Sequence, residues 1–285
     1  MSDSITRDIA LTGIPRSGTT LACRLLNQAT NVVALFEPMD VSAVPVAPVS
    51  AFVDHTQAYF AAVRQQVRET ATAPSKQRHG QVPDNLFAAT GHDGHRATQA
   101  VPGTITVAVR DDAYSLVIKH NAMFTAVLPA LAARIETVAI VRNPLAVLGS
   151  WNSVDLHVRN GRAPAGERLD PTLAQRLGAE HDVLERQLIL LDWFFARFAT
   201  HLPRERVLAY EDIVASQGAL LFDRMCVRGP AVNALRERNA SSAYINTDLD
   251  RCAAALRTRE GAWQHWYGPD AIASLHARMA SDTLR

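Results

Sequence analysis

The chain has 285 residues, of which 29 are Lys or Arg and 28 are Asp or Glu, so its formal net charge is +1. Hydrophobic residues make up 48% of it, which is typical of a globular protein and excludes a disordered or fibrous chain. The near-neutral charge argues against nucleic-acid binding through bulk charge. Three cysteines without a CxxC pair indicate reduced thiols, and no leader or long apolar stretch is evident. We therefore expect a cytoplasmic protein without a membrane span.

Short apolar runs alternate with segments of helical periodicity along the whole chain. Helices are expected directly after residue 18 and at residues 52–70, 123–133 and 173–200. Strands are expected at residues 9–12, 32–36, 114–118, 137–141 and 207–210. This alternation predicts an α/β fold, a three-layer sandwich with a mostly parallel central sheet and helices on both faces.

The sequence shows no internal repeat and no linker, which favours one domain over residues 1–285. Between about residues 71 and 104 the periodic pattern gives way to Pro, Gly, His, Gln and Asn, which predicts a loop-rich insert. Within it, His92, Asp93 and His95 are better explained as a solvated loop than as a metal site, because no further ligand pattern supports them.

The turn between the first strand and the first helix has the form of a phosphate-binding loop. Gly13 and Gly18 let the backbone curl, so that its N–H groups converge on an anion at a helix N-terminus. In the common nucleoside-triphosphate loop a lysine follows the second glycine. Here Thr19 follows instead, and the cation is Arg16, inside the loop. The turn predicts a P-loop-type fold whose phosphate-binding residues are Pro15, Arg16, Ser17, Gly18, Thr19 and Thr20.

A second candidate phosphate site begins where the strand at residues 137–141 ends. Arg142 stands at that strand end, and Ser150 follows eight residues later, two turns into the next helix. Open parallel sheets bind ligands at the carboxyl ends of their strands. Arg142 and Ser150 are therefore expected to hold one further phosphate.

Together these motifs resemble the sulfotransferase family, which uses 3′-phosphoadenosine 5′-phosphosulfate (PAPS). Residues 13–21 resemble the family's 5′-phosphosulfate loop, in the form found in its tyrosylprotein and bacterial branches. Residues 142–150 resemble its 3′-phosphate motif, and residues 210–212 are similar to a later landmark that we interpret as structural. The cytosolic branch has a tryptophan that stacks on adenine where this chain has Leu21, so the adenine contact is left unassigned.

The resemblance also implies catalytic roles for Arg16, Glu37 and Lys119. Glu37 follows the second strand, where the tyrosylprotein branch carries its general base, and Lys119 ends the third strand, where related enzymes contact the sulfuryl group. His120 is the rival base. A family loop that closes over the 3′-phosphate suggests Arg257, Arg259 and Gly261 as further donor-binding residues.

The resemblance thus implies a sulfotransferase that uses PAPS as donor, yields adenosine 3′,5′-bisphosphate and requires no metal. The acceptor is expected to be a hydroxyl, or an amine, of a neutral small molecule. The alternatives are a small-molecule kinase using ATP and Mg²⁺, disfavoured by the missing lysine after Gly18, and a non-catalytic nucleotide-binding module. Lys76 and Lys119 are the two lysines of the chain. We attribute the excess of arginine to a GC-rich genome, which makes a lysine at a special place, such as Lys119 at a strand end, more noteworthy.

Overall fold

The computed structural model describes residues 6–83, 87, 96–109, 113–232, 235–244 and 247–283. A five-stranded sheet lies at its centre, and all pairings in it are parallel. The strands, in the spatial order β2-β5-β1-β6-β7, are β2 (Val32–Phe36), β5 (Ser115–Lys119), β1 (Arg7–Gly13), β6 (Glu136–Val141) and β7 (Val207–Ala209). The five strands expected from the sequence are confirmed, with ends that differ by two residues or fewer.

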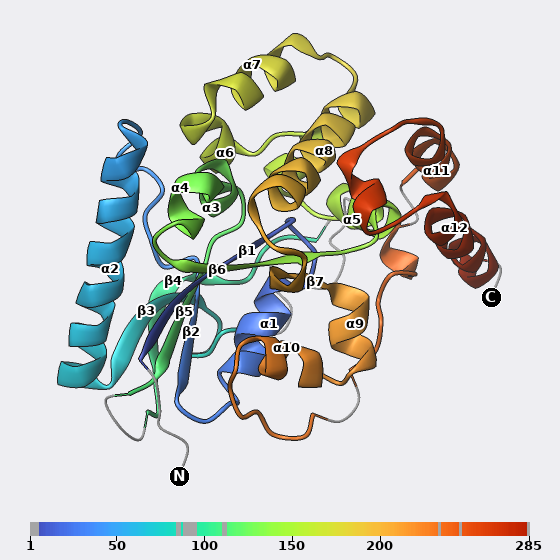
Figure 1. Cartoon of the computed structure of the whole chain (residues 1–285). Coiled ribbons are helices and arrows are strands. Elements are labelled where there is room, and N and C mark those ends of the chain that lie inside the picture. The colour runs from blue at the N-terminus through green and yellow to red at the C-terminus, as the bar shows by residue number, and fades with distance from the viewer. Residues whose placement is uncertain are drawn as a thin grey trace.

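Helices cover both faces of this sheet (Figure 1). One face carries α1 (Thr19–Leu26), α9 (Tyr210–Ala215) and α10 (Ala219–Arg224). The other carries α2 (Val49–Thr70), α3 (Ala122–Ala126) and α4 (Leu128–Ala132), with α8 (Val183–His201) packed on α3 and α4. The predicted three-layer α/β architecture is therefore confirmed.

The remaining helices lie beyond the carboxyl ends of the strands and in the C-terminal part of the chain (Figure 1). They are α5 (Pro144–Asn152), α6 (Pro164–Leu169), α7 (Pro171–Ala179), α11 (Leu249–Thr258) and α12 (Pro269–Thr283). Short 3₁₀ turns occur at His157–Asn160 (η1), Arg204–Arg206 (η2), Ser242–Tyr244 (η3) and Ala262–His265 (η4).

Two expected helices are each divided in two. The segment 173–200 forms α7 and α8, because Asp182 begins a new helix by accepting a hydrogen bond from the Glu185 N–H at 3.0 Å. The segment 123–133 is divided at Val127, where Pro129 occupies the first turn of α4. In both places a residue suited to a helix start interrupts a continuous apolar pattern.

The segment 71–104, expected to consist of loop, instead contains strands near both of its ends. β3 (Thr72–Gln77) and β4 (Val101–Thr106) pair antiparallel, from Thr72 opposite Thr106 to Gln77 opposite Val101. The hairpin docks beside β2, where the Phe36 N–H donates to the buried Ser75 hydroxyl at 3.0 Å. Residues 91–95, considered above for a metal, lie outside the described residues.

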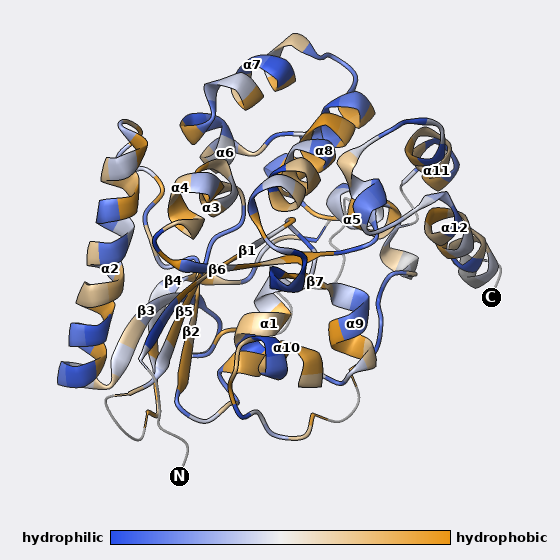
Figure 2. Ribbon diagram, viewed as in Figure 1, coloured by the Kyte–Doolittle hydropathy of each residue, from blue (hydrophilic) through white to orange (hydrophobic). Residues whose placement is uncertain are grey.

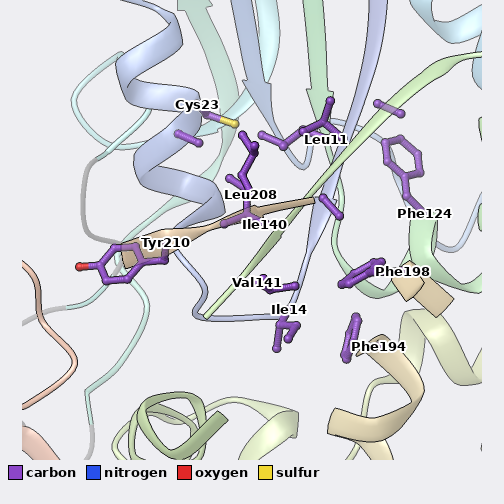
Figure 3. Packing of buried hydrophobic residues seen from close by; sticks show 14 of the residues in the cluster. Leu11, Ile14, Cys23, Phe124, Ile140, Val141, Phe194, Phe198, Leu208 and Tyr210 are labelled. Carbon is purple, nitrogen blue, oxygen red and sulfur yellow. The ribbon is translucent and has the colours of Figure 1, made fainter. Parts of the chain in front are cut away.

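One continuous hydrophobic core fills the space between the sheet and its helices. The middle parts of the central strands are apolar, and the helices that cover the sheet have both apolar and polar residues (Figure 2). Phe194 and Phe198 of α8 lie near Val141 and Ile14 on one side of the sheet, while Cys23 of α1 lies on the other (Figure 3). Among the helices of the described part of the chain, none combines the length and apolar character needed to cross a membrane.

Candidate functional site

The sequence motifs meet at one edge because all five strands of the sheet run in the same direction. Glu37 follows β2, Lys119 ends β5, Arg142 follows β6 and Tyr210 follows β7, while the glycine loop follows β1. Crevices at the carboxyl ends of parallel strands are where such sheets bind ligands. The strand order also determines the spatial order of these groups along the edge. Glu37 and Lys119 lie at one end, the glycine loop lies next to them, and Arg142 lies beyond the loop.

A cavity of about 750 Å³ opens at this edge. Its described lining holds eight basic side chains and two acidic ones. The basic residues are Arg16, Lys76, Arg96, Lys119, Arg142, Arg162, Arg236 and Arg238, and the acidic ones are Glu37 and Glu237. The cavity is thus strongly cationic in a chain whose formal net charge is +1, which suits an anionic ligand.

The glycine loop owes its shape to residues with left-handed backbone conformations. Arg16 has a φ of 75° and Gly18 a φ of 92°. A Cβ on Gly18 would lie 2.7 Å from the Tyr210 ring, and a Cβ on Gly13 would lie 2.5 Å from the Ile140 carbonyl oxygen. Both glycines are therefore required by the packing as well as by the turn. The first turn of α1, which starts at Thr19, carries no side-chain cap, so its N–H groups remain available to a ligand.

Most of the loop residues predicted to bind phosphate border the cavity. Pro15, Arg16, Gly18, Thr19 and Thr20 are part of its lining. Ser17 is different, because its buried hydroxyl donates to the Ile140 carbonyl at 2.8 Å and ties the loop to β6. The structure therefore gives the Ser17 side chain an anchoring position.

Arg16 and Arg142 bring the two predicted phosphate sites into contact. Arg16 Nε donates to the Ser150 hydroxyl at 3.0 Å, and Arg142 Nη1 donates to the Arg16 carbonyl at 2.9 Å. Burial, reinforced by the charges of Arg96 and Arg142, lowers the pKa of the Arg16 guanidinium to about 9. The positive charges of Arg16, Arg96 and Arg142 repel one another, and an anion bound between them would relieve this repulsion.

The partners of Arg142 are neutral groups. Its Nε donates to Asn239 Oδ1 at 2.7 Å, its Nη2 to the Arg238 carbonyl and the Tyr244 hydroxyl, and its guanidinium lies over the Tyr210 ring. No ion pair in the described part of the chain involves Arg16, Arg96, Arg142 or Arg238. These four guanidinium groups therefore keep their positive charge uncompensated by carboxylates of the described chain.

Glu211 holds the residues around Arg142 in place through hydrogen bonds, which agrees with the structural interpretation of residues 210–212. Its carboxylate accepts hydrogen bonds from the Asn143 N–H at 3.0 Å, from Asn239 Nδ2 at 2.7 Å and from the Tyr267 hydroxyl at 2.6 Å. Asn239 in turn accepts from Arg142. Glu211 thus orients Arg142 through Asn239 without contacting the cavity itself.

Glu37 lies between two lysine ammonium groups. Lys119 Nζ contacts Oε1 at 2.7 Å, and Lys76 Nζ contacts Oε2 at 2.6 Å. Burial alone would raise the pKa of Glu37, but the charges of Lys119 and Lys76 outweigh it and hold that pKa well below its usual range. Glu37 is therefore a carboxylate, and it has a left-handed φ of 44°, a strained conformation typical of functional sites.

His120 borders the same end of the cavity, beside Lys119. Burial lowers the pKa of its imidazole to about 3, although the nearby Glu37 charge acts in the opposite direction. Its Nε2 accepts a hydrogen bond from the Met39 N–H at 3.2 Å. The imidazole is consequently neutral, and the lone pair on Nε2 is already engaged.

The structure does not bring the predicted C-terminal residues to the cavity. Arg257 is an exposed residue of α11, Arg259 forms an ion pair with Glu185 of α8, and Gly261 packs against the Trp263 ring. None of the three is part of the cavity lining. The segment 235–244 covers the Arg142 side of the cavity instead.

Lys76, Arg96 and Arg238 border the cavity but were not singled out by the motifs. Arg96 donates to the Ser153 hydroxyl at 2.8 Å, and its buried Nε has no partner among the described residues. One signal for Lys76 was present in the sequence, because it is one of two lysines in an arginine-rich chain. Arg96 and Arg238 carry no comparable signal. No cluster of three or more His, Cys, Asp or Glu suited to a metal occurs in the ranges that the structure describes.

The solved structures similar to this chain include a sulfotransferase of low similarity. No model of a known protein family matches the chain, and no curated protein matches it in sequence. A crystal structure of sulfotransferase STF1 from Mycobacterium tuberculosis aligns over 97% of this chain and 77% of that one, with 13% identity and a TM-score of 0.34. At these values the similarity carries no argument about function, and the functional argument rests on the cavity.

Proposed function

We propose that this protein is a sulfotransferase that moves a sulfuryl group from PAPS to a hydroxyl, or an amine, of a small neutral molecule. The observation that carries the proposal is the pair of guanidinium groups of Arg16, which is half-buried, and Arg142, which is buried. They follow β1 and β6, at the two positions where the sequence motifs predict phosphates, and they have no carboxylate partner within the described chain.

The basic half of the cavity suits a nucleoside bisphosphate. Arg16, the N–H groups at the start of α1 and the hydroxyls of Thr19 and Thr20 would hold the 5′-phosphosulfate. Arg142 and Ser150 would hold the 3′-phosphate. An anion there would relieve the repulsion that lowers the pKa of Arg16, and it would offer a partner to the orphaned Nε of Arg96.

The other half of the cavity has the groups that sulfuryl transfer requires. Glu37 can take the proton of the acceptor O–H, and Lys119 can neutralise charge on the sulfuryl oxygens. As the acceptor oxygen bonds to sulfur, the bond from sulfur to the bridging phosphate oxygen breaks. Its electron pair leaves with adenosine 3′,5′-bisphosphate, whose charge Arg16 stabilises.

Apolar side chains make up much of the rest of the cavity lining, which supports an uncharged acceptor. They come from the segments that follow Glu37 and Lys119 and from residues 156–165, which also contribute His157 and Arg162. The apolar side chains are Val41, Ala122, Met123, Leu156, Val158, Ala163, Pro164 and Ala165.

Calorimetric titration with adenosine 3′,5′-bisphosphate, beside ATP with and without Mg²⁺, tests the donor. We expect the bisphosphate to bind without metal and Arg142→Ala to weaken it by about 10- to 100-fold, the effect of losing a charged hydrogen-bonding partner. Arg134→Ala is the matched control, since Arg134 is an exposed arginine paired with Asp54 on α2.

Three results would contradict the proposal, the first two at the donor site and the third at catalysis. Tight binding of ATP with Mg²⁺ and no response to the bisphosphate would favour a kinase. Bisphosphate binding that is equally strong in Arg142→Ala would place the ligand elsewhere. Bisphosphate binding without turnover on any panel of alcohols, phenols and amines would favour a non-catalytic module.

A further inference from the structure

Both lysines of the chain contact the same carboxylate. The 29 basic residues include two lysines, Lys76 and Lys119, and their ammonium groups contact different oxygens of Glu37, at 2.6 and 2.7 Å. Arginine occupies every other basic position. A lysine is a compact charge that can hold one oxygen and turn away from it, whereas the planar fork of an arginine binds both oxygens at once. Two lysines can therefore each hold one oxygen of Glu37, and either can release its oxygen while the other stays bound.

The hairpin presents Lys76 at this position through contacts of its own. Ser75 is buried, accepts a hydrogen bond from the Phe36 N–H at 3.0 Å and donates to the Lys76 carbonyl at 2.9 Å. The Phe36 ring lies 4.6 Å from the ammonium of Lys119 and 5.8 Å from that of Lys76. β3 is thereby fixed against β2, and Lys76 faces Glu37 from the side opposite Lys119.

We propose that Lys76 is a positioning residue that keeps Glu37 ionised and oriented while Lys119 turns from Glu37 to the transferred sulfuryl group. This proposal rests on the proposed function. The side chain of Lys119 is 2% exposed and its ammonium donates to Glu37 Oε1. To give its full charge to the sulfuryl oxygens and to free Oε1 for the acceptor, Lys119 has to release that carboxylate. If Lys119 were the only cation at Glu37, its departure would leave a half-buried carboxylate unpaired. Such a carboxylate is costly, and it would tend to take up a proton.

With Lys76 in place, the departure of Lys119 frees one oxygen and leaves the other paired. Oε2 stays bonded to Lys76, and Oε1 becomes available to the acceptor O–H. The proton of that hydroxyl moves to Oε1 as its oxygen bonds to sulfur, and the electron pair of the broken S–O bond leaves on the bisphosphate. Lys76 itself neither gains nor loses a proton.

The two lysines make a test possible in the protein without ligand. Labelling with ζ-¹⁵N-lysine gives two side-chain NMR signals, which Lys76→Arg and Lys119→Arg assign. Acid titration of the Lys119 signal then reports the protonation of Glu37. We expect the inflection of this titration curve to move to higher pH by roughly 1–3 units in Lys76→Met, because Glu37 then loses one of its two positively charged partners. In Lys76→Arg the inflection should stay near the wild-type value.

An inflection that does not move in Lys76→Met would overturn the proposal. Lys76→Gln is the second variant if the methionine destabilises the hairpin, and thermal melting checks the folding of both. A merely structural role for Lys76 would lower the melting temperature without shifting the inflection. This measurement requires no donor, so its result stands even if the proposed function fails.

Titration with PAPS, without acceptor, tests the movement of Lys119. We expect the Lys119 signal to shift on saturation and the Lys76 signal to stay in place. Equal shifts of both signals, or a shift of Lys76 alone, would contradict the division of roles. PAPS that does not bind by calorimetry would count against the proposed function, while the ligand-free titration would still decide the role of Lys76.

Discussion

At the scale of single residues, the two candidate bases differ in the state in which the fold holds them. His120 is neutral because burial lowers its pKa to about 3, and its Nε2 already accepts the Met39 N–H. Glu37 is a carboxylate whose two oxygens each accept a hydrogen bond from a lysine ammonium group. A base must present a free lone pair to its substrate, and Glu37 can do so when one lysine moves. The geometry therefore favours Glu37.

Glu37→Gln should abolish proton acceptance and leave the donor site intact. We expect kcat to fall by about 10²- to 10⁴-fold, which is the usual contribution of a general base. Affinity for adenosine 3′,5′-bisphosphate should be unchanged, because Glu37 lies at the opposite end of the edge from Arg142. Steady-state kinetics and calorimetry on the same preparation measure the two effects.

The pH dependence of His120→Ala separates the two bases. Since the pKa of Glu37 is held below its ordinary range, kcat/KM of the wild type should stay level as the pH falls through about 5. His120→Ala should keep that profile even if its rate is lower. Wild-type turnover by Glu37→Gln, together with a loss of turnover at every pH in His120→Ala, would instead assign the proton transfer to His120.

At the scale of elements, the sequence predicts what depends on local pattern. The buried strands follow from uninterrupted apolar runs, and the glycine loop follows from its spacing. The β3–β4 hairpin could not be predicted, because its strands contain Pro74 and Gly103 and no apolar alternation. Contacts between segments that are distant in the sequence could not be predicted either. Lys76 and Glu37 are 39 positions apart, and Arg142 reaches Arg238 across 96.

The contact between α5 and η3 gives a prediction that rests on such a long-range pair. Gly149 lies inside α5, and a Cβ there would lie 2.8 Å from the Tyr244 ring. Tyr244 belongs to the segment that covers Arg142, with its hydroxyl 3.3 Å from Nη2. Gly149→Ala should displace this segment and destabilise the protein by about 1–3 kcal/mol, the usual cost of overpacking. Chemical denaturation measures the loss, and weaker bisphosphate binding should accompany it.

Gly178→Ala is the matched control in another helix. Gly178 is exposed in α7, and a Cβ there meets nothing within 4 Å. Alanine is the better helix former, so this variant should stabilise the protein by about 0.4–1 kcal/mol. If Gly149→Ala stabilised the protein as much as Gly178→Ala, the close packing of α5 against Tyr244 would be refuted.

At the scale of the whole molecule, the sheet order separates the two halves of the cavity. Strands in a sheet are about 4.8 Å apart, so the three steps from β2 to β6 spread Glu37 and Arg142 along the edge. The basic half joins parts of the chain that are distant in sequence, since Arg16, Arg96, Arg142 and Arg238 come from four segments. An anion bound among them would link these segments and remove the mutual repulsion of the arginines.

Ligand binding should therefore stabilise the entire fold. With adenosine 3′,5′-bisphosphate at 100 times its Kd, mass action contributes about 2.7 kcal/mol, which corresponds to a rise in Tm of roughly 4–5 °C for a protein of 285 residues. Arg142→Ala should lose the rise at the same concentration, and Arg134→Ala should keep it. Sodium chloride of equal ionic strength separates specific binding from screening. If salt alone reproduced the rise, or if Arg142→Ala retained it, the arginines would not form the bisphosphate site.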